Sequence, residues 1–330
     1  MSLLSRREVL GRTASAAAAA AVPRNTWADT YPTHAIRLVI PYAAGGSGDQ
    51  IGRPWANKMA SLLGPMYIEN IGGAGGALGC SVVARGAPDG YSVLLGNGST
   101  QVIIPLASAN PIYDTVRDFR AIYRLITSAL AFAVHPSLPV NDLQELIAYA
   151  KVNPVKLSYG SPGVGTGNHL VGEMFKQQSG ATDIVHIPYR GSGPATNDLV
   201  GGQIPLMIAV VSGQLLQMNQ AGKLRILAVT SESRLSGAPG FPTAIESGMS
   251  DLKYEGWFGL FAPKATPDAI VDRIASATAI AMADPELCEE YRSQGMEPDT
   301  KSTPYKFQQF VEDEFARLAP VIKSIGLKRD

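Results

Sequence analysis

The sequence has 330 residues, of which 45% are hydrophobic, so it can bury one large core or two modest ones, and its length favours two lobes. Lysine plus arginine equals aspartate plus glutamate at 28 each, and only 17% of the residues are charged. Because no basic field exists to attract phosphate backbones or anionic lipid, nucleic acid is not an expected partner.

The first 28 residues have the order of an export signal. SRREVLG at residues 5–11 carries paired arginines, an alanine-rich apolar run follows at 14–22, and TWA at 26–28 supplies small residues for a cleavage site. The sequence therefore predicts a twin-arginine signal peptide cleaved after Ala28, with a disordered basic N-terminus as the alternative. No cysteine follows the apolar run and no later stretch reaches about 20 apolar residues, so we expect a soluble periplasmic protein without membrane insertion.

Cysteine and histidine are scarce. Cys80 and Cys288 lie in apolar, helix-like surroundings, so buried free thiols are predicted and a disulfide between them is the alternative. The four histidines, at 34, 135, 169 and 186, show no zinc-ligand spacing with these cysteines. No metal and no cofactor is predicted.

Strands and helices alternate in the first part of the chain. IRLVI at 36–40 is strand-like, PYAAGGSGDQ at 41–50 is a glycine loop, and residues 51–63 have helical spacing of apolar side chains. A second unit consists of strand 67–70, a glycine-rich loop, helix 79–86 and strand 91–95. The alternation predicts a parallel sheet with right-handed crossovers, whose carboxyl-end loops are where α/β folds bind ligands.

The pattern restarts near residue 129. We expect strands at 129–135, 156–161, 183–189, 204–211 and 224–230, a helix at 141–151 with Asn141 as N-cap and Gln144 completing a capping box, and a second glycine loop, GSPGVGTGNH, at 160–169. The turn RGSGP at 190–194 precedes a short helix at 195–200.

The C-terminal part returns to helices. Thr266 with Pro267, and Asp284 with Pro285, are predicted helix starts, Gly295 ends the second helix, and 256–264 resembles a strand. We therefore predict a discontinuous first lobe of residues 29–128 and 252–330, a second lobe of residues 129–251, and hinge crossings near 126–131 and 249–256. A simple N-terminal and C-terminal division is the alternative.

Three glycine loops follow strands and precede helices: residues 43–49, 160–169 and 190–194. Glycine lets successive backbone N–H groups point to one place, and a helix start adds unpaired donors and partial positive charge, so such loops favour an anion. The phosphate-binding patterns GxxxxGK[ST] and GxGxxG and the esterase pattern GxSxG all fail on spacing. A carboxylate held by backbone donors, hydroxyls and water is the remaining interpretation.

Several loop side chains have a structural alternative. Asp49 either binds ligand or complements a helix dipole, and Thr166 is an N-cap before it is a ligand contact. His169 is either a satisfied polar residue or a functional one, and Arg190 is either a solvated cation or part of the cleft wall.

Nine ordered blocks carry a family resemblance: YPTHAIRLVIPYAAGGSGD, YIENIGGAGGALG, ARGAPDGYSVLLG, YDTVRDF, DLQELIAYAK, KLSYGSPGVGTGNHL, HIPYRGSGPATNDLVGGQI, KLRILAVTSESR and GWFGLFAPKATP. Together they resemble the Bug family of periplasmic solute-binding proteins, the receptors of tripartite tricarboxylate transporters. The first loop departs from the family's usual PFAPGGGTD, since Ala44 replaces proline, Ser47 replaces glycine and Gly48 replaces threonine.

The resemblance implies a two-lobed α/β Venus-flytrap receptor of type II-like fold, monomeric and without catalytic residues. It implies that a small organic acid, such as a di- or tricarboxylate, an acidic amino acid or an aromatic acid, binds between the lobes for delivery to membrane transporter subunits. The ligand-binding residues it implies, together with His169, are Tyr42, Ala43, Ala44, Gly45, Gly46, Ser47, Gly48, Asp49, Ser161, Gly163, Gly165, Thr166, Tyr189, Arg190 and Gly191. A ligand sensor for a signalling partner, or a periplasmic enzyme using His169 and Asp49, is the alternative function.

Overall fold

The computed structural model describes residues 31–153 and 157–328. The chain divides into two units, residues 1–33 and 34–330, and the larger unit carries the described strands and helices. The predicted signal peptide lies outside the described residues.

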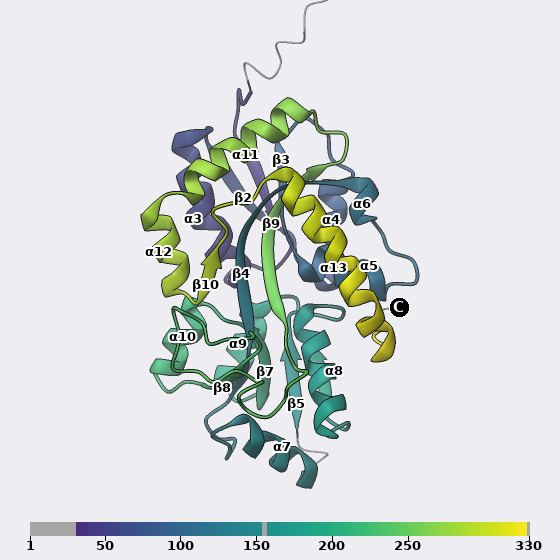
Figure 1. The fold of residues 1–330 in the computed structure, drawn as a ribbon, viewed down its shortest axis with the longest axis vertical. Coiled ribbons are helices and arrows are strands. Elements are labelled where there is room, and N and C mark those ends of the chain that lie inside the picture. The colour runs from purple at the N-terminus through teal and green to yellow at the C-terminus, as the bar shows by residue number, and fades with distance from the viewer. Residues whose placement is uncertain (1–30, 154–156, 329–330) are drawn as a thin grey trace, which may run out of the picture. The chain divides into compact units, whose positions relative to one another are not determined.

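A mixed sheet forms the centre of the larger unit, in the strand order β2-β1-β3-β9-β4-β7-β5-β6, with β8 and β10 also paired to β4 (Figure 1). The predicted α/β class is confirmed. The strands are β1 (Ile36–Ile40), β2 (Met66–Asn70), β3 (Ser92–Asn97), β4 (Phe119–Val134), β5 (Ser158–Ser161), β6 (Val185–Pro188), β7 (Leu206–Val210), β8 (Arg225–Val229), β9 (Glu255–Pro263) and β10 (Met296–Pro298).

The alternation of strands and helices predicted a parallel sheet, but the observed sheet is only partly parallel. Strand β1 pairs in parallel with β2 and β3, and β5 pairs in parallel with β6 and β7. The central strands β9 and β4 are antiparallel to each other and to their outer neighbours β3 and β7. The expectation fails in the centre because β4 and β9 are not joined to their neighbours by the strand-helix-strand crossovers that parallel pairing requires.

Strand β4 connects two sections of the sheet. Its first part pairs with β9 and β10, and its last residues pair with β7 and β8 (Figure 1). The sequence predicted a strand only from residue 129, whereas β4 is a 16-residue strand that already begins at Phe119. The division into two lobes at residues 128 and 252 remains a prediction, and β4 and β9 are the strands in which its crossings lie.

Helices cover the sheet. They are α3 (Ser47–Leu62), α4 (Ala77–Ala84), α5 (Ile104–Ala107), α6 (Thr115–Asp118), α7 (Leu143–Val152), α8 (Gly167–Ser179), α9 (Ser192–Val200), α10 (Gly213–Gln220), α11 (Asp268–Met282), α12 (Pro285–Ser293) and α13 (Pro304–Ser324), with a short 3₁₀ turn η1 (Ala74–Gly76) and a π turn η2 (Ser99–Ile103). Helices α3, α11 and α12 pack together, while α13 packs on β4, α5 and η2 (Figure 1).

Helix starts follow the predicted chemistry with two corrections. Asp284 caps α12 and Thr166 caps α8, as expected. The cap of α7 is Asp142, not Asn141, because its carboxylate accepts the N–H of Glu145. Glu145 Oε2 accepts the N–H of Asn141, the residue before the cap, so the predicted capping box of Asn141 and Gln144 is replaced by a related arrangement of Asp142 and Glu145. Helix α11 begins at Asp268 with Pro267 at the cap position, so Thr266 is not the cap.

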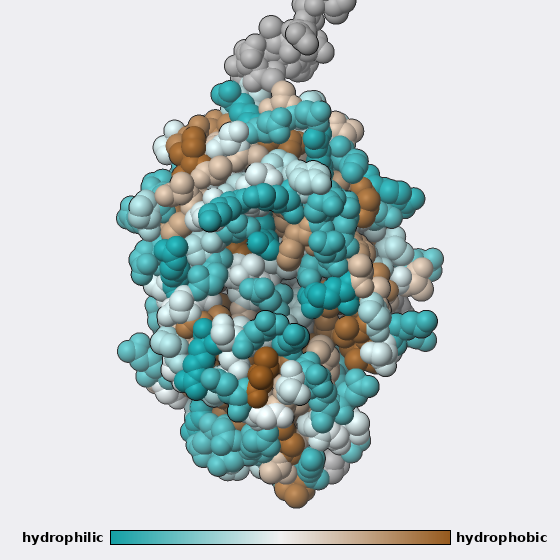
Figure 2. All heavy atoms as spheres, in the orientation of Figure 1, coloured by the Kyte–Doolittle hydropathy of each residue, from teal (hydrophilic) through white to brown (hydrophobic). Residues whose placement is uncertain are grey.

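Hydrophobic side chains are buried on both sides of the sheet, and both cysteines are buried free thiols, as predicted. The face in Figure 2 is largely hydrophilic, with hydrophobic residues in small separate groups. Among the described helices, none combines the length and the apolar character needed to cross a membrane.

Candidate functional site

A narrow pocket lies at the ends of several strands, with a cavity volume of about 30 Å³. Strands β3, β9, β4 and β7, which are neighbours in the sheet, and the starts of α3, α8 and α9 all contribute to it. The lining residues are Tyr42, Gly46, Ser47, Gly48, Asn97, Gly98, Ser99, Ser128, Leu130, Pro162, Gly167, Asn168, Ser192, Val210, Tyr254, Gly256, Trp257 and Phe258. Aspartate, glutamate, lysine, arginine and histidine are all absent from this lining, so its polarity comes from hydroxyls, amides and backbone.

Helix N-termini supply the electrostatics of the pocket. Helix α3 begins at Ser47 and α9 at Ser192, and no side chain caps either helix at its N-cap residue, Gly46 or Gly191. Helix α8 begins at Gly167, whose N–H donates to Ser99 Oγ at 2.8 Å. Uncapped first-turn N–H groups carry partial positive charge, so the pocket attracts an anion although its side chains are neutral.

The carboxylate of Asp49 stabilises the first glycine loop through hydrogen bonds and an ion pair. Gly45, with φ of +83°, donates its N–H to Asp49 Oδ2 at 2.7 Å, and the Asn70 side chain donates to the same oxygen at 3.3 Å. Arg53 pairs with Asp49 Oδ1 at 2.6 Å. The buried carboxylate therefore holds the shape of the loop, and it does not line the pocket.

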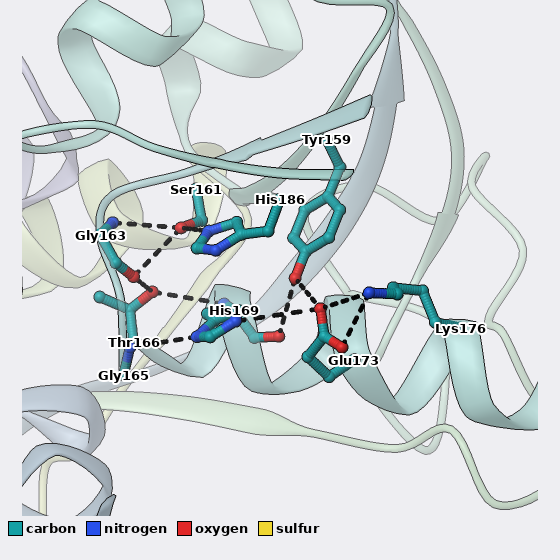
Figure 3. Close-up of polar contacts among 9 residues, drawn as sticks. All are labelled: Tyr159, Ser161, Gly163, Gly165, Thr166, His169, Glu173, Lys176 and His186. Carbon is teal, nitrogen blue, oxygen red and sulfur yellow. Dashed lines mark hydrogen bonds and ion pairs between the residues drawn. The ribbon is translucent and has the colours of Figure 1, made fainter. Parts of the chain in front are cut away.

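The second glycine loop is held by its own side chains (Figure 3). Ser161 Oγ accepts the N–H of Gly163 and donates to its carbonyl, each at 3.1 Å, and it lies 2.7 Å from His186 Nε2. Thr166 Oγ1 donates to the Gly163 carbonyl at 2.8 Å and accepts the N–H of His169. These contacts fix the chain direction at the start of α8, and the Gly163 N–H is bonded inside the loop.

His169 and His186 stack behind this loop with ring centroids 4.0 Å apart (Figure 3). His169 Nδ1 accepts the N–H of Gly165 at 3.2 Å, so this nitrogen carries no proton in the observed arrangement. Glu173, which accepts from Tyr159 and pairs with Lys176, lies 3.9 Å from His169 Nε2. Burial lowers the pKa of His169 to about 4 despite Glu173, and burial together with the neighbouring His169 lowers the pKa of His186 to about 3.

The third glycine loop meets the first. The Ala43 N–H donates to the Arg190 carbonyl at 3.4 Å, and a Cβ added to Gly191 would lie 3.3 Å from Ala43 N. The Arg190 side chain is exposed, and Tyr189 donates its hydroxyl to Asp198 at 2.8 Å. It is the backbone at these positions, not the side chains, that brings the two loops together.

Other approaches between the first part of the chain and residues 160–220 involve glycines, a short side chain and one glutamine pair. A Cβ added to Gly46 would lie 3.6 Å from Ser192 Cβ, and one added to Gly163 would lie 3.0 Å from the Cα of Gly75. Beside them, Gln50 and Gln214 form a reciprocal pair, with the Gln50 side-chain N–H donating to Gln214 Oε1 at 3.3 Å and the Gln214 backbone N–H donating to Gln50 Oε1 at 3.4 Å.

Comparison with known proteins agrees with this architecture. The family model described as tripartite tricarboxylate transporter family receptor matches residues 51–327. The chain belongs to this receptor family.

Three solved structures resemble the receptor along nearly its whole length. The periplasmic binding protein BugD is 34% identical, with a TM-score of 0.87, 91% of this chain and 100% of that chain covered. Rpa4515 of Rhodopseudomonas palustris with adipate is 31% identical, with a TM-score of 0.86 and coverage of 90% and 99%. MatC of the same organism with bound malate is 27% identical, with a TM-score of 0.84 and coverage of 88% and 100%.

The protein is thus a periplasmic solute-binding receptor of the tripartite tricarboxylate transporter family, and the suspected Bug resemblance and the binding-protein fold are confirmed. Of the predicted site residues, Tyr42, Gly46, Ser47 and Gly48 line the pocket of this receptor. The others are not among its lining residues: Ala43, Ala44, Gly45, Asp49, Ser161, Gly163, Gly165, Thr166, His169, Tyr189, Arg190 and Gly191.

The sequence did not indicate several lining residues of the receptor. Asn97, Gly98 and Ser99 follow the apolar strand β3, and this strand-then-glycine signal resembles the one that marked the other loops. Ser128 and Gly256 carry no local signal, because they become neighbours only when β4 pairs with β9. Val210 and Trp257 also line the pocket, whereas Trp55 is buried in the core. Within residues 31–153 and 157–328, no group of three His, Cys, Asp or Glu side chains could hold a metal ion.

Proposed function

We propose that the receptor binds a small dicarboxylate in this pocket and delivers it to the membrane subunits of a tripartite tricarboxylate transporter. The observation that carries the proposal is the convergence of two uncapped helix starts, those of α3 and α9, with the capped start of α8 beside them, on a pocket lined without charged side chains. Helix N-termini bind carboxylates through N–H donors and partial charge without a cationic side chain. The solved relatives that carry adipate and malate bind acids of this class.

Closure of two hinge-linked lobes completes the proposal. Loops from both predicted lobes line the pocket, so a ligand that contacts both stabilises the closed arrangement over an open one. With a cavity of about 30 Å³, the observed pocket is nearly shut, and a dicarboxylate enters when the lobes separate. We expect the receptor to act as a monomer, which light scattering on the mature chain measures.

The proposed receptor has no catalytic step. His169 and Asp49, the residues of the enzyme alternative, do not line the pocket and are bonded to their own loops. A ligand recovered chemically unchanged after prolonged incubation with the protein agrees with the receptor function, whereas turnover contradicts it.

The experiment that tests the ligand class is a thermal-shift screen followed by calorimetry on protein beginning at Asp29. Succinate, malate, aspartate, adipate, citrate and benzoate are compared with the diamide of succinate, which has the same chain but no charge. We expect at least one diacid to raise the melting temperature and the diamide to leave it unchanged. A shift with neutral solutes and none with acids would refute the proposal.

A further inference from the structure

The strands that line the pocket form its floor and carry two polar side chains, Ser128 on β4 and Asn97 at the end of β3, and the Asn97 amide is already bonded to Tyr42 and Thr100. Leu130, Val210 and Phe258 contribute apolar surface, and Gly256 contributes no side chain. Trp257 also borders the floor, but its indole N–H donates to Glu314 Oε2 at 3.3 Å on the far side of β9. An apolar strip of this kind suits the carbon chain of a ligand.

Ser128 interrupts this apolar floor. The residue is 3% exposed, and its Oγ has no hydrogen-bond partner among the described residues. It lies on β4 directly opposite Gly256 of β9, where a Cβ added to the glycine would lie 3.3 Å from the hydroxyl. Buried hydroxyls are normally bonded, and one without a partner at the surface of a binding pocket is available to a ligand. The absent side chain of Gly256 keeps the space beside it open.

We propose that the Ser128 hydroxyl binds a polar substituent on the carbon chain of the ligand, so that the receptor prefers a hydroxy- or amino-dicarboxylate to the unsubstituted acid of the same length. The inference rests on the proposed function, in which helix starts hold the carboxylates. Ser128 belongs to a strand in the centre of the floor and not to a helix start, so it faces the body of the ligand. A site that offers a hydrogen bond at one position discriminates strongly against an analogue that cannot make it, because its own polar group then stays unpaired.

The test compares three acids of equal length, succinate, malate and aspartate, with malate used as both enantiomers, by calorimetry. Wild-type protein is expected to bind malate or aspartate at least about tenfold more tightly than succinate. Ser128→Ala is expected to lose about tenfold for the substituted acid and to bind succinate as before, so the preference disappears. Gly256→Ala retains the serine but places a methyl group against it, and we expect the same loss of preference.

Ser231→Ala is the matched control. Ser231 Oγ is also buried without a partner, but it borders a different cavity beside β8 and not the ligand pocket. It is expected to leave all affinities unchanged. Ser128→Ala is also expected to melt no lower than wild type without ligand, because removing an unpaired buried hydroxyl is neutral or stabilising.

An unchanged preference in both Ser128→Ala and Gly256→Ala would overturn the inference, as would wild-type protein that binds succinate as tightly as malate and aspartate. The proposed function survives either result, since dicarboxylate binding is retained. If wild-type protein binds none of the acids and no other dicarboxylate, the proposed function itself is wrong.

Discussion

Placing a negative charge at the start of α9 tests whether helix starts bind the ligand. Ser192 is the first residue of α9, borders the pocket and lies close to Gly46 of the first loop, with 3.6 Å between Ser192 Cβ and a Cβ added to the glycine. Ser192→Asp would add a carboxylate where we propose that a ligand carboxylate binds. The helix itself tolerates the change, because a negative charge in the first turn interacts favourably with the partial positive charge at the helix N-terminus.

The expected effect is large. Two unit charges about 5 Å apart, at an effective dielectric constant of about 20, repel by about 3 kcal/mol, which corresponds to roughly two orders of magnitude in Kd. Calorimetry with the best diacid from the screen measures this loss, and thermal unfolding without ligand should show a melting temperature equal to or above that of wild type.

Asn197→Asp is the control on the same helix. Asn197 is exposed, lies outside the pocket and would gain the same charge in a nearly identical shape. Its affinity is expected within about threefold of wild type, because exposed charges are screened by salt and water. If Ser192→Asp binds the diacid like wild type, or if Asn197→Asp weakens it equally, the ligand is not held at the start of α9.

Three further predictions concern stability and closure. The folded protein lowers the pKa of His169 to about 4 and that of His186 to about 3, so below about pH 6.5 the unfolded chain binds more protons than the folded protein. The free energy of unfolding is therefore expected to be flat above pH 7 and to fall on acidification towards pH 4. In urea titrations, the double variant His169→Gln with His186→Gln should show a weaker pH dependence. Glu314→Ala removes the buried hydrogen-bond acceptor of Trp257 and Arg317, and it is expected to lower the free energy of unfolding by about 1–3 kcal/mol and to change tryptophan fluorescence. The control Glu312→Ala, which loses only exposed hydrogen bonds, should change neither. Equal losses of stability in the two variants would contradict this prediction. The methyl group of Gly163→Ala would press against Gly75, so this variant is expected to increase the radius of gyration in solution scattering. The control Gly180→Ala also changes a glycine at positive φ, but its methyl group would meet no atom within 4 Å, and the radius should stay unchanged. Identical radii for the two variants would argue against closure at the contact of Gly163 with Gly75.

Local chemistry was sufficient to predict the outer strands and their loops. The run IRLVI correctly gave β1, and Thr166 and Asp284 were recognisable as caps because their side-chain oxygens reach the first-turn N–H groups. Helix α3 was predicted from residue 51 but begins at Ser47, because the last residues of the glycine loop already form its first turn. The antiparallel centre was missed because the alternation of strands and helices does not reveal which strand a returning segment will pair with.

Only a small part of the pocket lining was predictable, for a similar reason. Glycine loops mark their positions in the sequence, but the N–H groups of Gly45, Gly163 and Gly165, which the pattern suggested were free, are bonded to the side chains of Asp49, Ser161 and His169. Ser128 and Gly256 are 128 residues apart in the chain, and their pairing through β4 and β9 depends on the whole sheet. Spacing patterns describe neighbours along the chain and contain no information on such contacts.

The backbone-level contacts between the glycine loops have a consequence for speed. Where Gly46 faces Ser192 and Gly75 faces Gly163, no long side chain reaches across to interlock with the opposite surface. Separating the surfaces at these two contacts leaves short groups and peptide bonds that water hydrates at once, so no rotamer has to be freed there, and the long side chains that must separate are those of the Gln50–Gln214 pair beside them. If the predicted lobes hinge apart at these contacts, we expect the rate of solute exchange to depend on the hinge motion and on the breaking of the Gln50–Gln214 pair.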